Sequence, residues 1–226
     1  MKYNLQTQYN GFTNKFIEGT DIHNKISRRE YYSALETILF SQKKVLDVGC
    51  GDGYDIKKLL RKKAFMHGID SSKNLVEKAR KNNPNASIIE GNMECLPYED
   101  SFFDVVLSKY VLQTSTNVPK VLAEMDRVLK PGGIITYLTV HPLRQFLEKK
   151  KHPKDYFKQE IVESIFFGGT VSAQEPTHTM NKYLNPEFLR NFRITYFKEH
   201  TDFPSSEKVD GDIYPCFFVL KAEKRM

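Results

Sequence analysis

Cysteine is scarce in this sequence and tryptophan is absent: the 226 residues include three cysteines and no tryptophan. Cys50, Cys95 and Cys216 are odd in number and widely spaced, and they form no Cys-x-x-Cys pair and no cluster with histidine. This pattern argues against a disulfide framework and against a zinc site, so we predict no metal centre. We expect a protein of a reducing compartment, the cytoplasm.

Long apolar runs are also missing. The longest stretch without a charged residue, from Pro131 to Leu143, contains glycine, threonine and histidine. It is too short and too polar to cross a bilayer. The first residues, MKYNLQTQYNG, lack the apolar core that a signal peptide needs. We therefore predict neither a membrane span nor a signal peptide.

The remaining composition is that of a globular protein, with 40% apolar and 27% charged residues. The length suits one large domain with a sizeable core, and 16 Phe and 12 Tyr supply many of its side chains. Lysine and arginine number 34 against 28 aspartate and glutamate, so the formal net charge is +6. An excess of positive charge is compatible with nucleic-acid binding, and the placement of the basic residues decides whether it indicates such binding.

Short apolar runs alternate with amphipathic helical patterns over residues 41–140. The predicted strands are Lys44–Val48, Phe65–Ile69, Ser87–Glu90, Phe103–Ser108 and Ile134–Val140. The predicted helices between them are Asp55–Lys63, Lys73–Asn82 and Val118–Leu129. Strands separated by helices of about ten residues indicate a βαβ series and a parallel sheet.

The flanking segments follow other patterns. Residues 1–40 are predicted to be helical from about Ser27, with one apolar face made by Tyr32, Leu35, Ile38 and Leu39. Residues 141–226 are predicted to hold three helices, Pro142–Lys151, Asp155–Phe166 and Pro186–Asn191, with a flexible turn at Gly168–Gly169. Two closing strands, expected to pair antiparallel, are Ile194–His200 and Cys216–Ala222. The basic clusters at 57–63 and 149–151 fall in helical patterns, where charged runs usually form a solvated face.

The strongest chemical signal is the run VLDVGCGDG at residues 45–53, an apolar strand that enters a turn with glycine at alternate positions. Glycine lets the backbone approach a ligand and adopt positive φ. Dinucleotide-binding turns use GxGxxG, whereas this one is GxGxG with Asp47 two residues before the first glycine. A carboxylate there would repel a pyrophosphate and suits a ligand with an ammonium group.

Asp70 stands at the end of the second predicted strand. An acid at that place characteristically accepts from the two hydroxyls of a ribose. Asp47 and Asp70 together predict a nucleoside that carries a cationic amino-acid tail, and S-adenosylmethionine fits that description.

The sequence resembles the class I S-adenosylmethionine-dependent methyltransferases, in particular the small-molecule enzymes related to those of ubiquinone biosynthesis. The resemblance rests on four segments in the family's order: VLDVGCGDG (45–53), GIDSS (68–72), GNMECLPYEDSFFDVVLSKYVLQ (91–113) and LAEMDRVLKPGG (122–133). It implies an α/β, doubly wound, Rossmann-like fold with a mostly parallel seven-stranded sheet, helices on both faces and an antiparallel C-terminal strand. It also implies one methyltransferase domain over 1–226, with a helical lid at 1–40, a cofactor-binding core at 41–140 and acceptor-pocket helices with the final strands at 141–226.

The resemblance further implies S-adenosylmethionine as co-substrate, S-adenosylhomocysteine as product, and a set of cofactor contacts. Those expected near the methionine portion are Asp47, Gly49, Cys50, Gly51 and the carbonyl of Ser108. Those expected near the ribose and adenine are Asp70, Ser71, Asn92 and Met93, and Lys109 with Tyr110 begins the active-site wall. The family often has aspartate in place of Asn92, but an amide oxygen can also accept from the exocyclic amine.

The N-terminal segment carries a looser likeness to the family. It implies that Tyr9, Arg28 and Arg29 belong to a lid, with an arginine at the cofactor carboxylate. A surface helix with ordinary arginines is the alternative. Asp47 could instead cap amides of its turn, Asp70 could be a helix N-cap, and the side chains of Cys50 and Met93 could serve only in packing.

A sulfonium methyl group is already activated, so the enzyme's task is to align a nucleophile and exclude water. Where a base is needed, the candidates are His141, just past the fifth strand, and His178, in a Glu-Pro-Thr-His turn. The rings expected at the acceptor pocket are Phe157, Phe166, Phe167, Tyr183 and Phe188.

The predicted function is methyl transfer to an oxygen, nitrogen or carbon atom of a small molecule. The alternatives are a tRNA or rRNA methyltransferase, a non-catalytic cofactor-binding subunit and a nicotinamide-dependent oxidoreductase. We do not expect a nucleic-acid partner, because no aromatic–basic RNA-binding motif is present and the basic residues fall on helix faces. The sequence leaves the oligomeric state open.

Overall fold

The computed structural model describes residues 5–11, 18, 24–166, 169, 171–201 and 211–226. Most of the strands form one twisted sheet in the order β3-β2-β1-β4-β5-β9-β8. Their bounds are β1 Lys44–Val48, β2 Phe65–Asp70, β3 Ser87–Glu90, β4 Phe103–Lys109, β5 Leu129–Val140, β8 Phe192–His200 and β9 Phe217–Lys224. The first five strands pair parallel, and β9 is antiparallel to both of its neighbours.

This sheet confirms the predicted fold class and the antiparallel pairing of the last two strands. Each of the five strands predicted in the core is present, with ends that move by at most a residue except at β5, which begins at Leu129 instead of Ile134. Of the five added residues, Leu129 pairs with Phe103, and the four that follow it bulge from the ladder, since Ile134 is the next paired residue.

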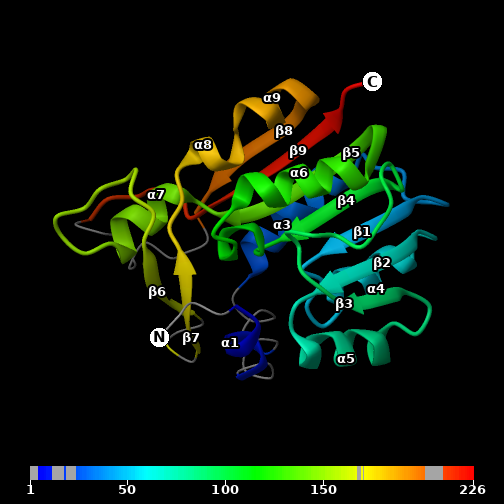
Figure 1. Cartoon of the computed structure of the whole chain (residues 1–226), viewed down its shortest axis with the longest axis horizontal. Helices are drawn as coiled ribbons and strands as arrows, with labels where there is room; N and C mark the ends of the chain where they lie inside the picture. Colours follow the sequence, from blue (N-terminus) through cyan, green and yellow to red (C-terminus); the bar gives the residue numbers. More distant parts are fainter. Residues whose placement is uncertain (1–4, 12–17, 19–23, 167–168, 170, 202–210) are drawn as a thin grey trace.

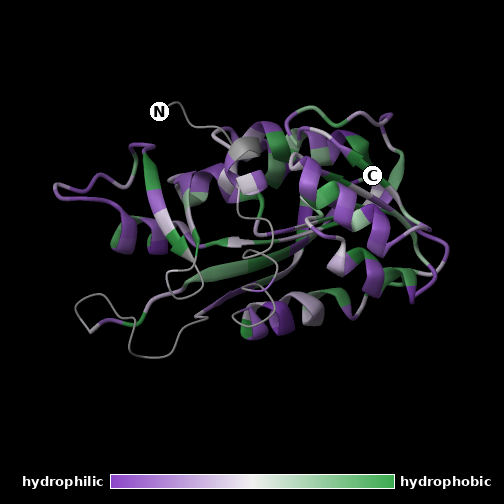
Figure 2. Ribbon diagram, turned by 90° about the horizontal axis from the view of Figure 1, so that it is seen from below, coloured by the Kyte–Doolittle hydropathy of each residue, from purple (hydrophilic) through white to green (hydrophobic). Residues whose placement is uncertain are grey.

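Helices cover both faces of the sheet (Figures 1 and 2). One layer contains α3 Lys25–Leu35, α4 Tyr54–Leu60 and α5 Lys73–Asn82. The opposite layer contains α6 Val118–Val128, α8 Met180–Tyr183 and α9 Pro186–Asn191. The short helix α1, Leu5–Gly11, lies between α5 and a two-stranded hairpin in Figure 1. This hairpin belongs to residues 141–226, which we call the third block. Among the described residues, no helix is long and apolar enough to cross a membrane.

Two hydrophobic cores result from the alternation of side chains along the buried strands. In β1, Val45 packs with α3, α4 and α5, whereas Leu46 and Val48 pack with the α6 layer. Parallel strands buried on both faces are read from the sequence as continuous apolar runs, which is why they were predictable here. Asp47 falls on the same side of β1 as Val45, toward the α3–α4 layer.

The predicted helix at Asp155–Phe166 is wrong. Residues 161–166 form β6, Ile161–Phe166, which pairs antiparallel with β7, Val171–Pro176. Val162 and Ser164 are buried while Ile161 and Ile165 are 43% and 63% exposed, so burial follows the strand period of two. The apolar residues at 161, 162, 165 and 166 also fit helical spacing, which explains the error. Gly169 has φ +91 in the connection, while Gly168 lies outside the described residues.

The predicted helix at Pro142–Lys151 is present only in its first part. Residues Pro142–Arg144 form α7 and Gln145–Lys149 continue as one π-helical turn. Lys149 and Lys150 are not solvated, as their side chains are 8% and 1% exposed. Lys149 pairs with Glu175 at 3.0 Å, and Lys150 donates to backbone carbonyls of the following loop. Buried lysine requires such partners, and these lie too far along the chain for a local pattern to reveal.

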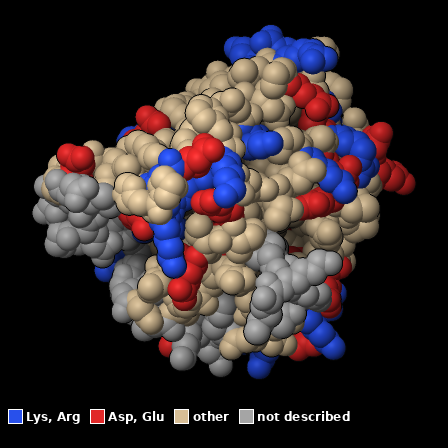
Figure 3. Space-filling view, turned by 60° about the vertical axis from the view of Figure 1, so that its left-hand side comes forward, with Lys and Arg blue, Asp and Glu red and all other residues tan. Residues whose placement is uncertain are grey.

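The other basic cluster is solvated as predicted. Its exposed residues are Lys57, Lys58, Arg61, Lys62 and Lys63, in α4 and just after it. On the face shown in Figure 3, basic and acidic side chains are interspersed apart from a short basic strip at the upper edge. On this face, the basic residues are therefore not gathered into one groove.

The expected ring positions are corrected in several places. Phe157 is 79% exposed, while Tyr183 and Phe188 are core residues beside Tyr137. Phe167 lies outside the described residues, as does the side chain of Phe166. Leu39 is 85% exposed because α3 ends before it.

Candidate active site

A cavity of about 640 Å³, open to solvent, lies at the carboxyl ends of the parallel strands. Its walls follow β1, β2, β3 and β4, on either side of the point where the strand order reverses at β1. Ligands of open α/β sheets bind at such switch points. The predicted cofactor residues that line it are Tyr9, Gly49, Gly51, Asp70, Ser71, Asn92, Met93 and Lys109.

The glycine turn is held tightly against the rest of the cavity wall. Gly49 has φ +74, and a Cβ there would lie 2.1 Å from Cγ2 of Val111. Gly51 has φ +55, but a Cβ there would meet no protein atom within 4 Å. Gly49 therefore permits packing inside the protein, whereas Gly51 faces open space at the cavity.

Asp70 joins the second strand to this turn. Its Oδ2 accepts from the Gly51 N–H at 2.9 Å, and its Oδ1 accepts from the Ser72 N–H at 2.9 Å. Burial raises the pKa of Asp70, and these N–H groups oppose the shift. Each carboxylate oxygen keeps a further lone pair that can accept from a hydroxyl. The N-cap of α5 is Ser72, which accepts from Leu75, so Asp70 is not the cap.

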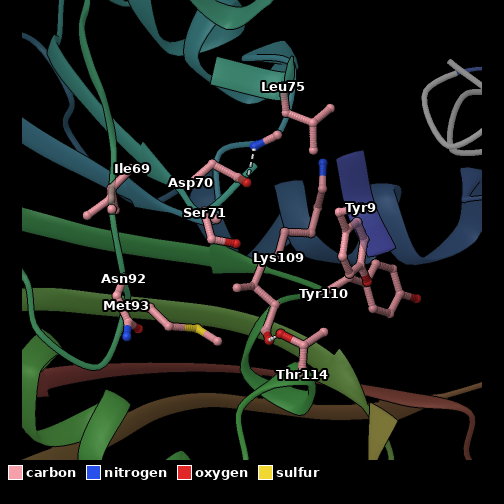
Figure 4. Close-up of a pocket in the computed structure, with 14 residues that line it drawn as sticks. Tyr9, Ile69, Asp70, Ser71, Leu75, Asn92, Met93, Lys109, Tyr110 and Thr114 are labelled. Atoms are coloured by element: carbon pink, nitrogen blue, oxygen red, sulfur yellow. Dashed lines mark hydrogen bonds between the residues drawn. The ribbon is translucent and has the colours of Figure 1, made fainter. Parts of the chain in front are cut away.

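Asn92 and Met93 lie at the left end of the cavity in Figure 4, and Tyr9 and Tyr110 at the right. Asn92 Oδ1 accepts from the Glu94 N–H at 2.9 Å. The Met93 side chain is 8% exposed and belongs to the core that includes α6. This burial agrees with the packing interpretation for the Met93 side chain, and Met93 also lines the cavity.

The loop after Asn92 is clamped by Arg127 from α6. Its guanidinium donates to the carbonyls of Leu96 and Tyr98 at 2.8 Å each, and to Asp100 and Glu124. Glu124 in turn accepts from the Leu96 N–H at 2.7 Å. One arginine thus fixes three positions of the loop that carries Asn92 and Met93.

Lys109, at the end of β4, pairs with the buried carboxylate of Asp55 in α4, which also accepts from the Tyr32 hydroxyl. Burial acts to raise the pKa of Asp55, but Lys109 and Tyr32 lower it below its usual range. Burial and the Asp55 charge raise the pKa of Asp47 well above its usual range, and Lys109 opposes this. Lys109, which lines the cavity, therefore interacts with two buried acids, Asp47 and Asp55, that do not line it.

Five residues predicted for the cofactor site or its lid do not line the described cavity. Asp47 faces the α3–α4 layer, and the Cys50 thiol is buried against Gly68. The Ser108 hydroxyl donates to the Val48 carbonyl at 3.0 Å, which joins β4 to β1. The Arg28 guanidinium stacks on the Tyr54 ring at 4.4 Å, and Arg29 pairs with Glu30 at 3.0 Å on the surface.

Both candidate bases have structural partners. His141 accepts from the Leu143 N–H through Nδ1 and contacts Glu199 through Nε2 at 2.8 Å. His178 is 4% exposed, and its Nε2 lies 3.0 Å from the carbonyl oxygen of Gln113. Neither histidine lines the described cavity. Within the described part of the chain, no group of His, Cys, Asp or Glu could hold a metal ion.

Sequence reasoning missed several lining residues, namely Ile69, Leu75, Gly91, Val111 and Thr114. Ile69 and Gly91 adjoin predicted contacts at strand ends and could have been found from that position alone. Val111 and Thr114 belong to the segment around the 3-10 turn η1, Leu112–Thr114, which carries no polar motif of its own.

Known proteins resemble this chain in both sequence and fold. The model of the family described as "Methyltransferase domain" matches residues 39–188, which is more than half of the chain. The chain belongs to the methyltransferase-domain family. The motif-based expectation of a class I methyltransferase is thereby confirmed at the level of family and fold.

Relatives within this family are similar over parts of their length. Malonyl-[acyl-carrier protein] O-methyltransferase of Halorhodospira halophila is 32% identical over 113 residues, or 48% of this chain and 38% of the relative. Phthiotriol/phenolphthiotriol dimycocerosates methyltransferase of Mycobacterium leprae is 26% identical over 183 residues, or 77% of this chain and 67% of the relative. The chain spans 25% to 67% of the length of these and two further relatives.

Solved structures share the methyltransferase fold over nearly the whole chain. An S-adenosylmethionine-dependent methyltransferase from Listeria monocytogenes superposes with a TM-score of 0.70 at 22% identity, covering 89% of this chain and 99% of that one. The [4+2]-cyclase SpnF superposes with a TM-score of 0.68 at 18% identity, covering 98% and 96%. Because a cyclase shares the fold, the fold alone does not specify the reaction.

Proposed function

We propose that this protein transfers the methyl group of S-adenosylmethionine to an oxygen, nitrogen or carbon atom of a small-molecule acceptor and releases S-adenosylhomocysteine. The observation that carries the proposal is the Asp70 carboxylate, fixed by the Gly51 N–H and directed into the cavity between the glycine turn and the Asn92 loop. A carboxylate there suits ribose hydroxyls and not a phosphate chain.

The groups that line the cavity suit the donor set of such a co-substrate. Asp70 would accept from the ribose hydroxyls, and Asn92 with the Met93 N–H would meet the adenine edge. Gly49 and Gly51 would lie along the methionine portion. The contacts of Asp47, Cys50, Arg28 and the Ser108 carbonyl with the co-substrate remain predictions.

The co-substrate supplies an activated methyl group on a sulfonium, so the chemical step is one in-line displacement. The acceptor lone pair forms the new bond to carbon as the carbon–sulfur bond breaks, and a protonated acceptor atom loses its proton to solvent or a base. The residues of this chain orient the reactants and exclude water. Tyr9, Lys109, Tyr110 and Thr114 form the wall at the end of the cavity opposite Asn92. A role of His141 or His178 as the base remains a prediction.

For the acceptor, we favour a small molecule or an acyl or lipid group. The relatives named above act, by their names, on malonyl-acyl carrier protein and on a dimycocerosate lipid. On the face shown in Figure 3, the interspersed charges give no support for an RNA acceptor.

Calorimetry with S-adenosylhomocysteine and with NAD tests the co-substrate. We expect binding of the first and not of the second, and the reverse result would overturn the proposal. A labelled-methyl screen against fatty acyl thioesters, phenols, quinones, amines and bulk tRNA then tests the acceptor. Transfer to tRNA alone would replace the small-molecule proposal with RNA methylation.

A further inference from the structure

His178 lies in the loop between β7 and α8, at the boundary of the third block and the cofactor-binding core. Its backbone N–H donates to Gln145 Oε1 at 3.0 Å, and its ring packs edge-on against Tyr183 with centroids 5.7 Å apart. The backbone hydrogen bond and the ring contact therefore position His178 independently of the hydrogen bonds of its ring nitrogens.

The contacts of the ring fix its tautomer. Nε2 lies 3.0 Å from the Gln113 carbonyl oxygen, which can only accept, so Nε2 carries the hydrogen. Nδ1 then has the lone pair, and it lies 3.5 Å from Nε2 of Gln159, an amide donor. A general base needs a lone pair that faces the substrate. The lone pair of His178 faces a side chain of the protein instead.

The recipient of this hydrogen bond belongs to the cavity wall. Gln113 is the middle residue of η1. Val111, just before η1, and Thr114, its last residue, line the cavity. Its side chain donates to the Tyr110 carbonyl at 2.9 Å and accepts from the Thr139 hydroxyl at 2.9 Å. Gln113 is 3% exposed, so each of its polar groups depends on protein partners.

We propose that His178 is a positioning residue, whose Nε2–H donates to the Gln113 carbonyl and holds η1 against the co-substrate cavity. The inference rests on the proposed function for its consequence in binding, and on the hydrogen-bond geometry for the role itself. In this proposal, the loop between β7 and α8 fixes the part of the cavity wall around η1, where Val111 packs on Gly49.

The charged neighbours agree with a neutral ring. Burial lowers the pKa of His178 to about 4, the Gln113 carbonyl and Glu175 act to raise it, and Lys182 acts to lower it. Near neutral pH the ring therefore has one hydrogen, the one that the Gln113 carbonyl requires.

The tautomer of His178 and the stability of η1 can both be measured without a ligand. In long-range ¹H–¹⁵N correlation spectra, the His178 ring should show the Nε2–H form, and the Nδ1–H form would overturn the proposal. Hydrogen exchange of the Thr114 and Ser115 amides, which bond to Val111 and Leu112, reports on η1. We expect about 3- to 10-fold faster exchange in His178→Ala, the loss of one hydrogen bond.

Substitutions of different reach separate positioning from catalysis. A glutamine amide can reach the place of Nε2, whereas an asparagine amide lies nearer to Nδ1. We therefore expect His178→Gln to retain slow exchange and S-adenosylhomocysteine affinity, and His178→Asn to lose both about 3- to 10-fold, as His178→Ala does. Gln159→Ala removes the Nδ1 contact and a hydrogen bond to the Thr116 carbonyl but leaves the Nε2–H bond to Gln113 in place, so it serves as the control and should leave both unchanged.

Two outcomes distinguish the possible failures. If the wild-type protein does not bind S-adenosylhomocysteine, the proposed function fails, while the exchange and tautomer results still test the role of His178. If His178→Gln keeps η1 protected and binds the product normally but abolishes methyl transfer, His178 acts in catalysis and the positioning role is wrong.

Discussion

The Asp70 carboxylate accepts a hydrogen bond from the backbone N–H of Gly51 at 2.9 Å, which joins the end of β2 to the turn that follows β1 in the cavity wall. The same group thus shapes the glycine turn and presents its remaining lone pairs to a ligand. A substitution at Asp70 is therefore expected to affect both the turn and the binding of a ribose.

Replacing Asp70 with asparagine should weaken S-adenosylhomocysteine binding about 10- to 100-fold. The amide keeps the size of the side chain but has one acceptor oxygen in place of two, so it cannot serve both backbone N–H groups and two hydroxyls. Calorimetric titration measures the change. Glu99→Gln, an exposed residue outside the cavity, is the matched control, and an equal loss in that variant would contradict a specific role for Asp70.

Gly49→Ala and Gly51→Ala form a pair that separates packing from binding. A Cβ at Gly49 would lie 2.1 Å from Cγ2 of Val111, so we expect a loss of about 2–4 kcal/mol in the free energy of unfolding. At Gly51 a Cβ meets no protein atom within 4 Å, and the cost should stay near 1–2 kcal/mol for its positive φ. Urea unfolding measures both values.

The same pair should behave in the opposite order in product binding. The Gly51→Ala methyl group faces the cavity, so this variant should fold and yet bind S-adenosylhomocysteine poorly. Adding Val111→Ala to Gly49→Ala should recover part of the lost stability. Equal stabilities for the two glycine variants would show that the Val111 contact does not limit the turn.

Arg127→Ala should release the loop that carries Asn92 and Met93. It removes charge-assisted bonds to the carbonyls of Leu96 and Tyr98, which we expect to cost about 2–3 kcal/mol of stability. Arg127→Lys should recover less than half of this, because one ammonium cannot reproduce the planar fork. Arg193→Ala, at a pair whose arginine is 65% exposed, should change the unfolding free energy by less than about 0.5 kcal/mol.

Acid should destabilise the protein partly through His178. Its pKa falls from 6.5 to about 4 in the folded state, so between these values the unfolded chain binds the extra proton. The stability that the neutral ring contributes is present above pH 6.5 and is lost as the pH falls toward 4. The total amounts to at most about 3 kcal/mol. The wild type should therefore lose more unfolding free energy than His178→Gln between pH 7.5 and 4.5, and parallel curves would contradict this.

The parallel sheet was predictable from sequence because each strand is a short apolar run that ends in a turn. Asp70, Asn92 and the glycine turn follow such runs directly, so their positions at the carboxyl edge follow from the strand assignments alone. Alternation along β1 also predicts the side-chain direction of Asp47, since it places Asp47 on the same face as Val45.

The secondary structure and burial of the third block were harder to predict because they depend on contacts between residues far apart in the sequence. Lys149 is buried by Glu175 and Ser164, residues of a hairpin whose first strand has the local spacing of a helix. The contacts of His178 with Gln113 and of Arg127 with Leu96 join separate elements in the same way. No periodic pattern encodes such pairs, so they appear only once the chain is folded.

The strand order also sets a constraint on the timing of folding. β9, near the end of the chain, lies between β5 and β8, and β8 joins the sheet through β9. During synthesis, β8 must wait for residues 217–224 before it can pair, and until then the edge of β5 stays open to solvent or to another chain. The sheet is thus complete only when β9 has paired. A deletion of β9 would also separate β8 from the sheet, although the sequence of β8 would be unchanged.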